Sequence, residues 1–286
     1  MIGKYRVDGK KSIKLKDFPT ADKGIFKNKE EGLLKLGENI EILSELQNKL
    51  YAEDTYSLLI IFQAMDAAGK DGTIKHVFSG INPQGFQIFN FKQPSMEELD
   101  HAYMWRTSKS MPERGRIGVF NRSYYEDVLV VRVHNLLSAQ HLPKEKQYKD
   151  IWKKRFHHIR EQEKYLFENG IIPIKFFLNV SKEVQKERFL ERIEDPSKNW
   201  KFSSADIEER KYWDDYQEAY EDAINHTSTS YAPWYVIPAD KKWFTKFAVS
   251  EVIKETLEGL NLKYPELNKT QKSELKNYKE ILLKDK

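Results

Sequence analysis

The stretch TYSLLIIFQAMDAAGKDGT, residues 55–73, decides the fold. Its first half, residues 56–62, is a short apolar run that contains the β-branched pair Ile60 and Ile61, which is typical of a strand buried on both faces. Small residues follow at 64–73, and helical character resumes at 74–78. The order of strand, small-residue loop and helix predicts a βα unit whose loop can bind phosphate.

The loop departs from the usual phosphate-binding pattern, G-x-x-x-x-G-K-[ST], at two positions. Ala64 replaces the first glycine, and Asp71 replaces the hydroxyl residue that binds Mg²⁺. Lys70 still adds a full positive charge beside the start of the helix, where the helix dipole favours anions. Asp66 and Asp71 are therefore the nearest candidates to hold the metal. The alternative is a plain turn in which the glycines only supply conformational freedom.

Two longer motifs extend this pattern. The sequence FQAMDAAGKDGTIKHVFSGINPQGFQIFNFKQPS, residues 62–95, together with GVFNRSYYEDVLVVRVH, residues 118–134, closely resembles the polyphosphate kinase 2 family. The resemblance runs from about residue 56 to residue 238. It implies a P-loop kinase fold and phosphoryl transfer between inorganic polyphosphate and nucleotides. It also implies a homo-oligomer, either a dimer or a tetramer.

The composition of the 286 residues, 32% charged and 40% apolar, suits a soluble globular protein. No apolar run approaches the roughly 20 residues that a membrane-spanning helix needs, and the N-terminus lacks a signal-peptide core. We therefore expect a cytoplasmic protein without a membrane partner. The net charge of +4 is modest, because 48 basic residues nearly balance 44 acidic ones. This charge does not by itself predict a polyanionic partner. We expect no nucleic-acid partner.

The remaining elements follow from periodicity. Residues 1–29 are rich in lysine and predict an extended arm over the core, with a solvated tail as the alternative. Leucines and isoleucines recur every three or four positions at 29–53, which predicts an amphipathic helix. Residues 128–137 belong to a helix in the family, although their composition also allows a strand. Further strands are expected at 86–91, 117–120, 171–180 and 234–237, and further helices at 97–110, 144–169, 181–193 with Ser181 as N-cap, 206–225, 244–260 and 270–286.

This alternation predicts a three-layer α/β fold, P-loop kinase-like, with a central parallel sheet of about five strands flanked by helices. We divide the chain into a basic arm and helix at 1–50, a catalytic domain at 51–265 with a helical lid at about 181–205, and a C-terminal helix at 266–286, peripheral or intersubunit. Ligands bind outside the carboxyl ends of such strands. The loops that start at Gln63, Lys92, Asn121 and Ser181 are therefore expected to share one edge.

Phosphoryl transfer requires positive charge and positioning around the transferring group, with Mg²⁺ bridging its oxygens. Lys70 and the loop amides are expected to bind phosphates, and Lys75, on the same helix, either reaches a longer phosphate chain or is a solvated lysine. The residues of this loop are Ala67, Ala68, Gly69, Asp71, Gly72 and Thr73.

The third strand ends at Asn121, where P-loop enzymes commonly place an acidic residue that faces the metal. The resemblance implies Asp in many family members, so metal binding here depends more on Asp66 and Asp71. Arg122 offers a planar fork for bidentate phosphate contacts. The expected metal is Mg²⁺, with Mn²⁺ as a substitute.

Three further charged residues follow in the same motif. By resemblance, Glu126 and Asp127 face the nucleotide through metal, water or sugar contacts, and Arg132 faces it through phosphate. The alternative is a surface ion-pair network.

The expected lid carries Arg188 and Arg192, which share one helix face because they are four residues apart. Lid arginines of P-loop kinases close over the transferring group and exclude water. Trp200 could stack on a base. The alternative is that both arginines pair with Glu187 and Glu191.

These patterns favour a Mg²⁺-dependent enzyme that moves the terminal phosphoryl group of polyphosphate to AMP or ADP, with ATP as the final product. The expected catalytic residues are Asp66, Lys70, Arg122 and Arg188. Asn121 with Glu126 resembles the subgroup that accepts AMP as well as ADP. An ATP-dependent nucleoside monophosphate kinase is the first alternative, disfavoured by Ala64 and Asp71. A phosphate-binding or nucleic-acid-binding module without catalysis is the second.

Overall fold

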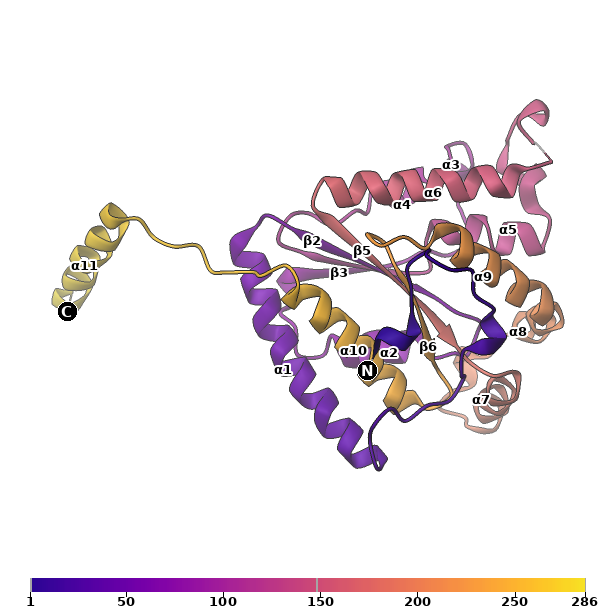
Figure 1. Ribbon diagram of the computed structural model, residues 1–286, viewed down its shortest axis with the longest axis horizontal. Helices are drawn as coiled ribbons and strands as arrows, with labels where there is room; N and C mark the ends of the chain where they lie inside the picture. Colours follow the sequence, from indigo (N-terminus) through magenta and orange to yellow (C-terminus); the bar gives the residue numbers. More distant parts are fainter. Residues whose placement is uncertain (1, 148, 286) are drawn as a thin grey trace.

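The computed structural model describes residues 2–147 and 149–285 (Figure 1). Met1, Tyr148 and Lys286 fall within the expected arm, the helix expected at 144–169 and the C-terminal helix, and they lie outside these described residues. Within the described ranges, no helix has both the length and the apolar character that crossing a membrane requires.

A six-stranded sheet forms the centre of the molecule, in the order β1-β6-β5-β2-β4-β3. The five longer strands pair in parallel, as predicted. Every residue of β2 is buried, as the apolar run had indicated. The sixth strand, β1, pairs antiparallel with β6 and was not predicted, because two residues carry no periodicity. The strands are β1 (Arg6–Val7), β2 (Ser57–Gln63), β3 (Phe86–Asn90), β4 (Ile117–Asn121), β5 (Ile171–Asn179) and β6 (Trp234–Pro238).

Helices cover both faces of this sheet (Figure 1). Helices α1, α2 and α10 pack together over one face, and α6 and α9 pack together over the other. The helices are α1 (Lys29–Glu53), α2 (Lys70–Val77), α3 (Met96–Leu99), α4 (Trp105–Ser108), α5 (Val130–Val133), α6 (Ile151–Glu168), α7 (Lys182–Glu194), α8 (Ser204–Glu209), α9 (Trp213–Thr227), α10 (Lys242–Glu258) and α11 (Lys269–Lys284).

Helix α1 has the predicted bounds, and α7, α10 and α11 lie within two residues of theirs. Ser181 caps α7, because its side chain accepts a hydrogen bond from the backbone N–H of Val184. Four predicted helices were wrong in extent. The helix expected at 144–169 begins only at Ile151, and a separate 3₁₀ turn occupies 144–146. Residues 97–110 form two short helices, α3 and α4; residues 128–137 form only α5 and a 3₁₀ turn separated by Asn135 in the left-handed region; and residues 206–225 are divided between α8 and α9.

The N-terminal arm is part of the core rather than a solvated tail. Ile2, Tyr5 and Val7 are almost fully buried, and Leu15 and Phe26 follow them into the same hydrophobic cluster. The arm therefore contributes apolar burial, while most of its lysines stay exposed.

A buried ion pair lies between the sheet and the helix layer that contains α6. Lys175 on β5 and Glu163 on α6 are both fully buried, and the ammonium donates to Glu163 and to the carbonyl of Thr227, 2.9 Å away. The second carboxylate oxygen of Glu163 lies 3.0 Å from the hydroxyl of Tyr124 and 2.8 Å from that of Tyr125. The pair is thus hydrogen-bonded on both sides, which buried charges require.

We expect Lys175→Met to lower the free energy of unfolding by about 3–5 kcal/mol, because it leaves Glu163 buried without its counter-charge. The measurement is the midpoint of urea unfolding, with the dependence of the unfolding free energy on urea concentration unchanged. The matched control is Lys164→Met on the same helix as Glu163, where the lysine is half exposed and 3.9 Å from Glu168. That control should change stability by less than about 1 kcal/mol. Equal midpoints for the two variants would contradict the prediction.

Candidate active site

The loop between β2 and α2 reverses direction through two residues in the left-handed region. Ala67 has φ 59° and Gly69 has φ 105°. Gly69 is the N-cap residue of α2, and its carbonyl accepts the backbone N–H of Thr73 at 3.0 Å. The left-handed conformation is energetically unfavourable for a non-glycine residue such as Ala67. It persists only where the surrounding structure enforces it. The start of α2 therefore faces the loop, as the sequence predicted.

Lys70 reaches back across the loop. Its ammonium donates to the carbonyl of Ala64 at 3.0 Å. Burial lowers the pKa of Lys70, and the nearby Arg122 guanidinium lowers it further, while Asp66 and Glu126 act in the opposite direction. Lys70 and Arg122 are thus two neighbouring basic side chains at the place where phosphate oxygens are expected.

Three of the predicted site residues meet beside this lysine. Arg122 follows β4 directly, with φ 64°, and its guanidinium lies 3.2 Å from Asp66 and 3.8 Å from Glu126. Glu126 is the main cause that raises the pKa of Arg122. Gln63, the last residue of β2, donates to Glu126 at 2.9 Å and so fixes the carboxylate.

Asn121 is the last residue of β4, and its side chain contacts both the start of α2 and the end of β3. Its amide nitrogen donates to Asp71 at 2.8 Å and to Asn90 at 2.7 Å. Two acceptors on one side identify that atom as the nitrogen. The amide oxygen of Asn121 is buried and has no hydrogen-bond partner among the described residues.

The expected metal ligands have the donor chemistry that a divalent cation of the Mg²⁺ type requires. The carboxylates of Asp66 and Asp71 and the unpaired oxygen of Asn121 are the hard donors that Mg²⁺ prefers. In the described part of the chain, no group of three or more His, Cys, Asp and Glu residues could hold a metal by itself. Mg²⁺ commonly needs only one or two carboxylates, because substrate phosphates and water complete its coordination.

Arg188 on α7 is a clamp for the loop. One nitrogen of its guanidinium donates to the carbonyls of Ala67 and Ala68, both at 2.9 Å. The other donates to the carbonyls of Ala239 and Asp240, at 2.7 and 3.0 Å. From the sequence, this arginine was expected in a lid over the transferring group. In the structure it is buried and holds the loop from behind.

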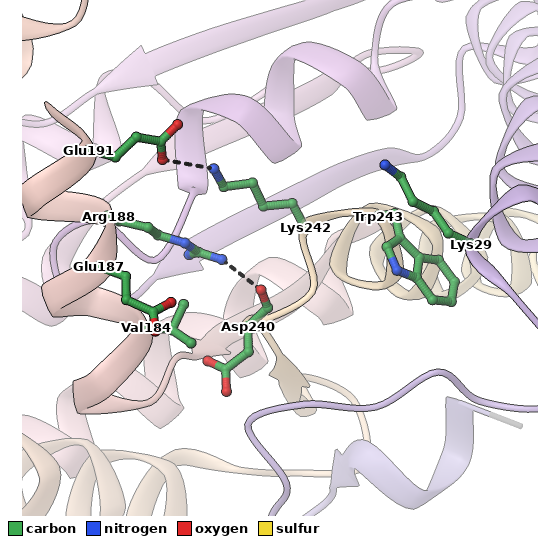
Figure 2. Close-up of a pocket in the computed structure, with 8 residues that line it drawn as sticks. All are labelled: Lys29, Val184, Glu187, Arg188, Glu191, Asp240, Lys242 and Trp243. Atoms are coloured by element: carbon green, nitrogen blue, oxygen red, sulfur yellow. Dashed lines mark hydrogen bonds and ion pairs between the residues drawn. The ribbon is translucent and has the colours of Figure 1, made fainter. Parts of the chain in front are cut away.

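A cavity of about 390 Å³ lies on the outer side of this clamp (Figure 2). Figure 2 shows Arg188 directed at Asp240, and Lys242 at Glu191, 3.9 Å away. Trp243 and Lys29 close the cavity on the side of α10 and α1. Burial lowers the pKa of Lys242, and Arg188 lowers it further.

The other lid residues lie apart from the clamp. Arg192 pairs with Asp206 at 3.5 Å and not with the glutamates of its own helix. Trp200 is 78% exposed, and its indole N–H donates to the carbonyl of Ser197 at 3.0 Å. The segment from the end of α7 to α8 is therefore mostly exposed to solvent.

Lys75, the other basic residue expected to reach phosphate, is exposed on α2.

Two residues expected on the nucleotide side have internal partners instead. Arg132 forms ion pairs with Asp222 at 2.7 Å and with Glu218 at 3.2 Å, both on α9. Asp127 is buried and accepts a hydrogen bond from Gln140 at 2.5 Å. Burial raises the pKa of Asp127 to about 6. Arg132 therefore belongs to an ion-pair network, the alternative given above, whereas Asp127 is a buried carboxyl group that binds Gln140 and fits neither expectation.

Three residues that contact the site were not predicted as site residues: Gln63, which was expected only as the start of a loop, Asn90 and Gln185. Gln63 and Asn90 are the last residues of β2 and β3, so the rule that ligands bind at the carboxyl ends of strands could have found them. Gln185 donates to the carbonyl of Asp66 at 2.9 Å. Nothing in its local pattern signals that contact, because it depends on how α7 packs.

The fold and the site together define a phosphate-binding α/β protein of the P-loop kinase class. A family model described as Polyphosphate kinase 2 matches residues 27–265. The chain belongs to the polyphosphate kinase 2 family.

Individual relatives agree along most of the chain. It is 50% identical over 282 residues to the ADP-polyphosphate phosphotransferase of Rhodopseudomonas palustris, covering 98% of each protein. It is 47% identical over 264 residues to the AMP/ADP-polyphosphate phosphotransferase of Meiothermus ruber, covering 92% of this chain and 95% of that protein. The crystal structure of polyphosphate kinase 2 from Arthrobacter aurescens TC1 matches with a TM-score of 0.86 at 39% identity, covering 95% of this chain and 94% of that one.

Two glycines of the loop provide a matched pair for testing its geometry. Gly69→Ala places a side chain at φ 105°, which should cost about 1–2 kcal/mol and displace the loop. We expect phosphoryl transfer to fall between about 10- and 100-fold. Gly72→Ala lies inside α2 with no atom within 4 Å of the added carbon. The substitution keeps the backbone N–H that position 72 offers to phosphate, so it should preserve activity and stabilise the protein by about 0.5–1 kcal/mol. Thermal midpoints and rates of both variants measure this, and equal loss of activity in both would refute the assignment.

Proposed function

We propose that this chain transfers the terminal phosphoryl group of inorganic polyphosphate to AMP and to ADP, reversibly and with Mg²⁺. Family membership makes the chain a polyphosphate-dependent phosphotransferase. The observation that carries the proposal is the meeting of Lys70, Asp66 and Arg122 at a loop that lacks the usual first glycine and hydroxyl residue. The relatives' names support AMP and ADP as acceptors. A homo-oligomer in the cytoplasm stays a prediction.

The residues of the chain act chiefly by position and charge. Lys70 and the loop amides bind phosphate oxygens, and Arg122, held between Asp66 and Glu126, presents its guanidinium to the transferring group. Asp66, Asp71 and Asn121 would hold Mg²⁺. When bound, the ion neutralises charge on the phosphate oxygens. Arg188 contributes indirectly, because it fixes the carbonyls of the loop.

The reaction is a direct displacement. An oxygen of the nucleotide's terminal phosphate forms a bond to the last phosphorus of polyphosphate, and the bond from that phosphorus to the rest of the chain breaks. The shortened polyphosphate leaves with the electron pair. The phosphate nucleophile is already ionised at neutral pH, so the site needs no strong base. The segment around Arg192 and Trp200 would exclude water on closing.

The donor is tested by product analysis. Pure protein with Mg²⁺ is incubated with AMP and polyphosphate, with ADP and polyphosphate, and with AMP and ATP, before chromatography of the nucleotides. We expect ADP and ATP to form with polyphosphate, and little conversion with AMP and ATP. If only ADP reacts with polyphosphate, the AMP acceptor is rejected. Transfer from ATP alone would make the protein a nucleoside monophosphate kinase and reject the proposal.

The catalytic assignments are tested by Lys70→Ala and Asp66→Ala. Each removes a charge from the site, and we expect kcat to fall by at least about 100-fold. Thermal midpoints should stay close to that of the parent protein. Lys164→Ala, which removes an exposed lysine on α6, is the matched control and should retain full activity. Full activity of either site variant at normal stability would withdraw that residue from the mechanism.

A further inference from the structure

Helix α11 has an apolar stripe but no partner in the described part of the chain. None of its residues is buried. Figure 1 shows it standing away from the body at the end of an extended segment. Leu275, Tyr278 and Ile281 are each more than half exposed, and Leu282 is 70% exposed. An isolated helix of 16 residues is marginal in water, so burial of this stripe would stabilise it.

The stripe of α11 has a basic flank. Leu275, Tyr278 and Leu282 are spaced three and four residues apart, which places them on one side of the helix. Lys272, Lys276 and Lys279 have the same spacing and lie beside them. The helix carries five lysines and two glutamates, a net charge of +3.

The outer face of α1 has the opposite character. The inner face of α1 packs on α10, and the outer face exposes Leu33 at 41% and Leu34 at 72%. Open space lies beside Gly37, where another helix could approach closely. The exposed glutamates around these residues are Glu30, Glu31, Glu38, Glu41 and Glu45. With six glutamates and three lysines, α1 has a net charge of −3.

We infer that α11 of one copy of this chain docks on the outer face of α1 of a second copy. Apolar side chains form the seam of such a contact, and opposite charges on its flanks select the partner. Pairing of α11 with itself would bring two helices of +3 together, which disfavours that arrangement. The inference does not depend on the proposed phosphoryl transfer.

The segment before α11 favours exchange between copies. Its start is fixed at the end of α1, where the backbone N–H of Lys263 donates to Glu53 at 2.7 Å. Pro265 then restricts the backbone, and the segment leads away from its own body (Figure 1). The six residue-to-residue steps from Lys263 to Lys269 span at most about 20 Å. In a two-fold dimer the contact forms twice, which doubles the buried apolar area.

The chain contains no cysteine, so single cysteines report the contact directly. Full-length Gly37→Cys and Tyr278→Cys chains, distinguished by a mass tag, are mixed and treated with a short bis-maleimide. We expect a cross-linked heterodimer. The control pairs Tyr278→Cys with Tyr165→Cys, a site on α6 that is also exposed, and should give no more than background.

Other cross-linking results would overturn the inference. If the double variant in one chain yields only a cross-linked monomer, α11 docks on its own α1. Cross-linked homodimers of Tyr278→Cys in place of the heterodimer would mean that α11 pairs with itself. Equal yield with the Tyr165→Cys control would mean that the contact is not specific.

Charge exchange tests the same contact by sedimentation. Lys272→Glu, Lys276→Glu and Lys279→Glu together should raise the dimer dissociation constant at least tenfold. Adding Glu38→Lys, Glu41→Lys and Glu45→Lys should restore it, although Glu38 and Glu45 already pair with Lys35 and Lys49. A monomeric parent protein, or an oligomer that the first triple variant leaves unchanged, would reject the inference.

Discussion

The buried pair of Lys175 and Glu163 ties the catalytic edge of the sheet to its helix layer. Lys175 comes from β5 and Glu163 from α6, and the carboxylate also binds the hydroxyls of Tyr124 and Tyr125. Those tyrosines follow Arg122 by two and three residues. An uncompensated charge at this depth is costly, so the network has little freedom to rearrange. The backbone that carries Arg122 is consequently held in place by this buried network.

The second constraint acts on the phosphate loop from behind. Ala67 and Arg122 both adopt the left-handed conformation that non-glycine residues disfavour; Ala67 lies in the loop after β2, and Arg122 directly follows β4. Arg188 holds the carbonyls of Ala67 and Ala68 while it also binds Ala239 and Asp240 after β6. With these carbonyls held from behind, the opposite side of the loop remains for phosphate. The loop is thus organised before any ligand arrives, which is how a site stabilises developing charge without reorganisation.

Much of this arrangement could be predicted from the sequence because it depends on local patterns. The buried strands appear as apolar runs, α1 as a three-to-four periodicity, and Lys70 with Asp66 as a loop motif. The role of Arg188 could not be predicted, because its partners are backbone carbonyls that any residue offers. Asp127 was misplaced for a related reason, since its burial depends on the packing of Gln140 and Arg155 around it. Contacts that depend on tertiary packing produce little signal in the spacing of residues along the sequence.

The two departures from the usual phosphate-loop pattern are connected in space. At position 71 an aspartate replaces a hydroxyl residue, and at position 121 an asparagine stands where an acidic residue is common. The amide of Asn121 donates to Asp71 at 2.8 Å, a bond that two carboxylates could not form. Asp71 thus supplies the negative charge that Asn121 lacks, while Asn121 orients it and keeps its own oxygen unpaired. This edge of the sheet therefore has the carboxylate of Asp71 and the neutral amide oxygen of Asn121 beside Asp66. Position 71 carries the hydrogen-bond acceptor and position 121 the donor, the reverse of the usual pattern of a hydroxyl at the first position and a carboxylate at the second.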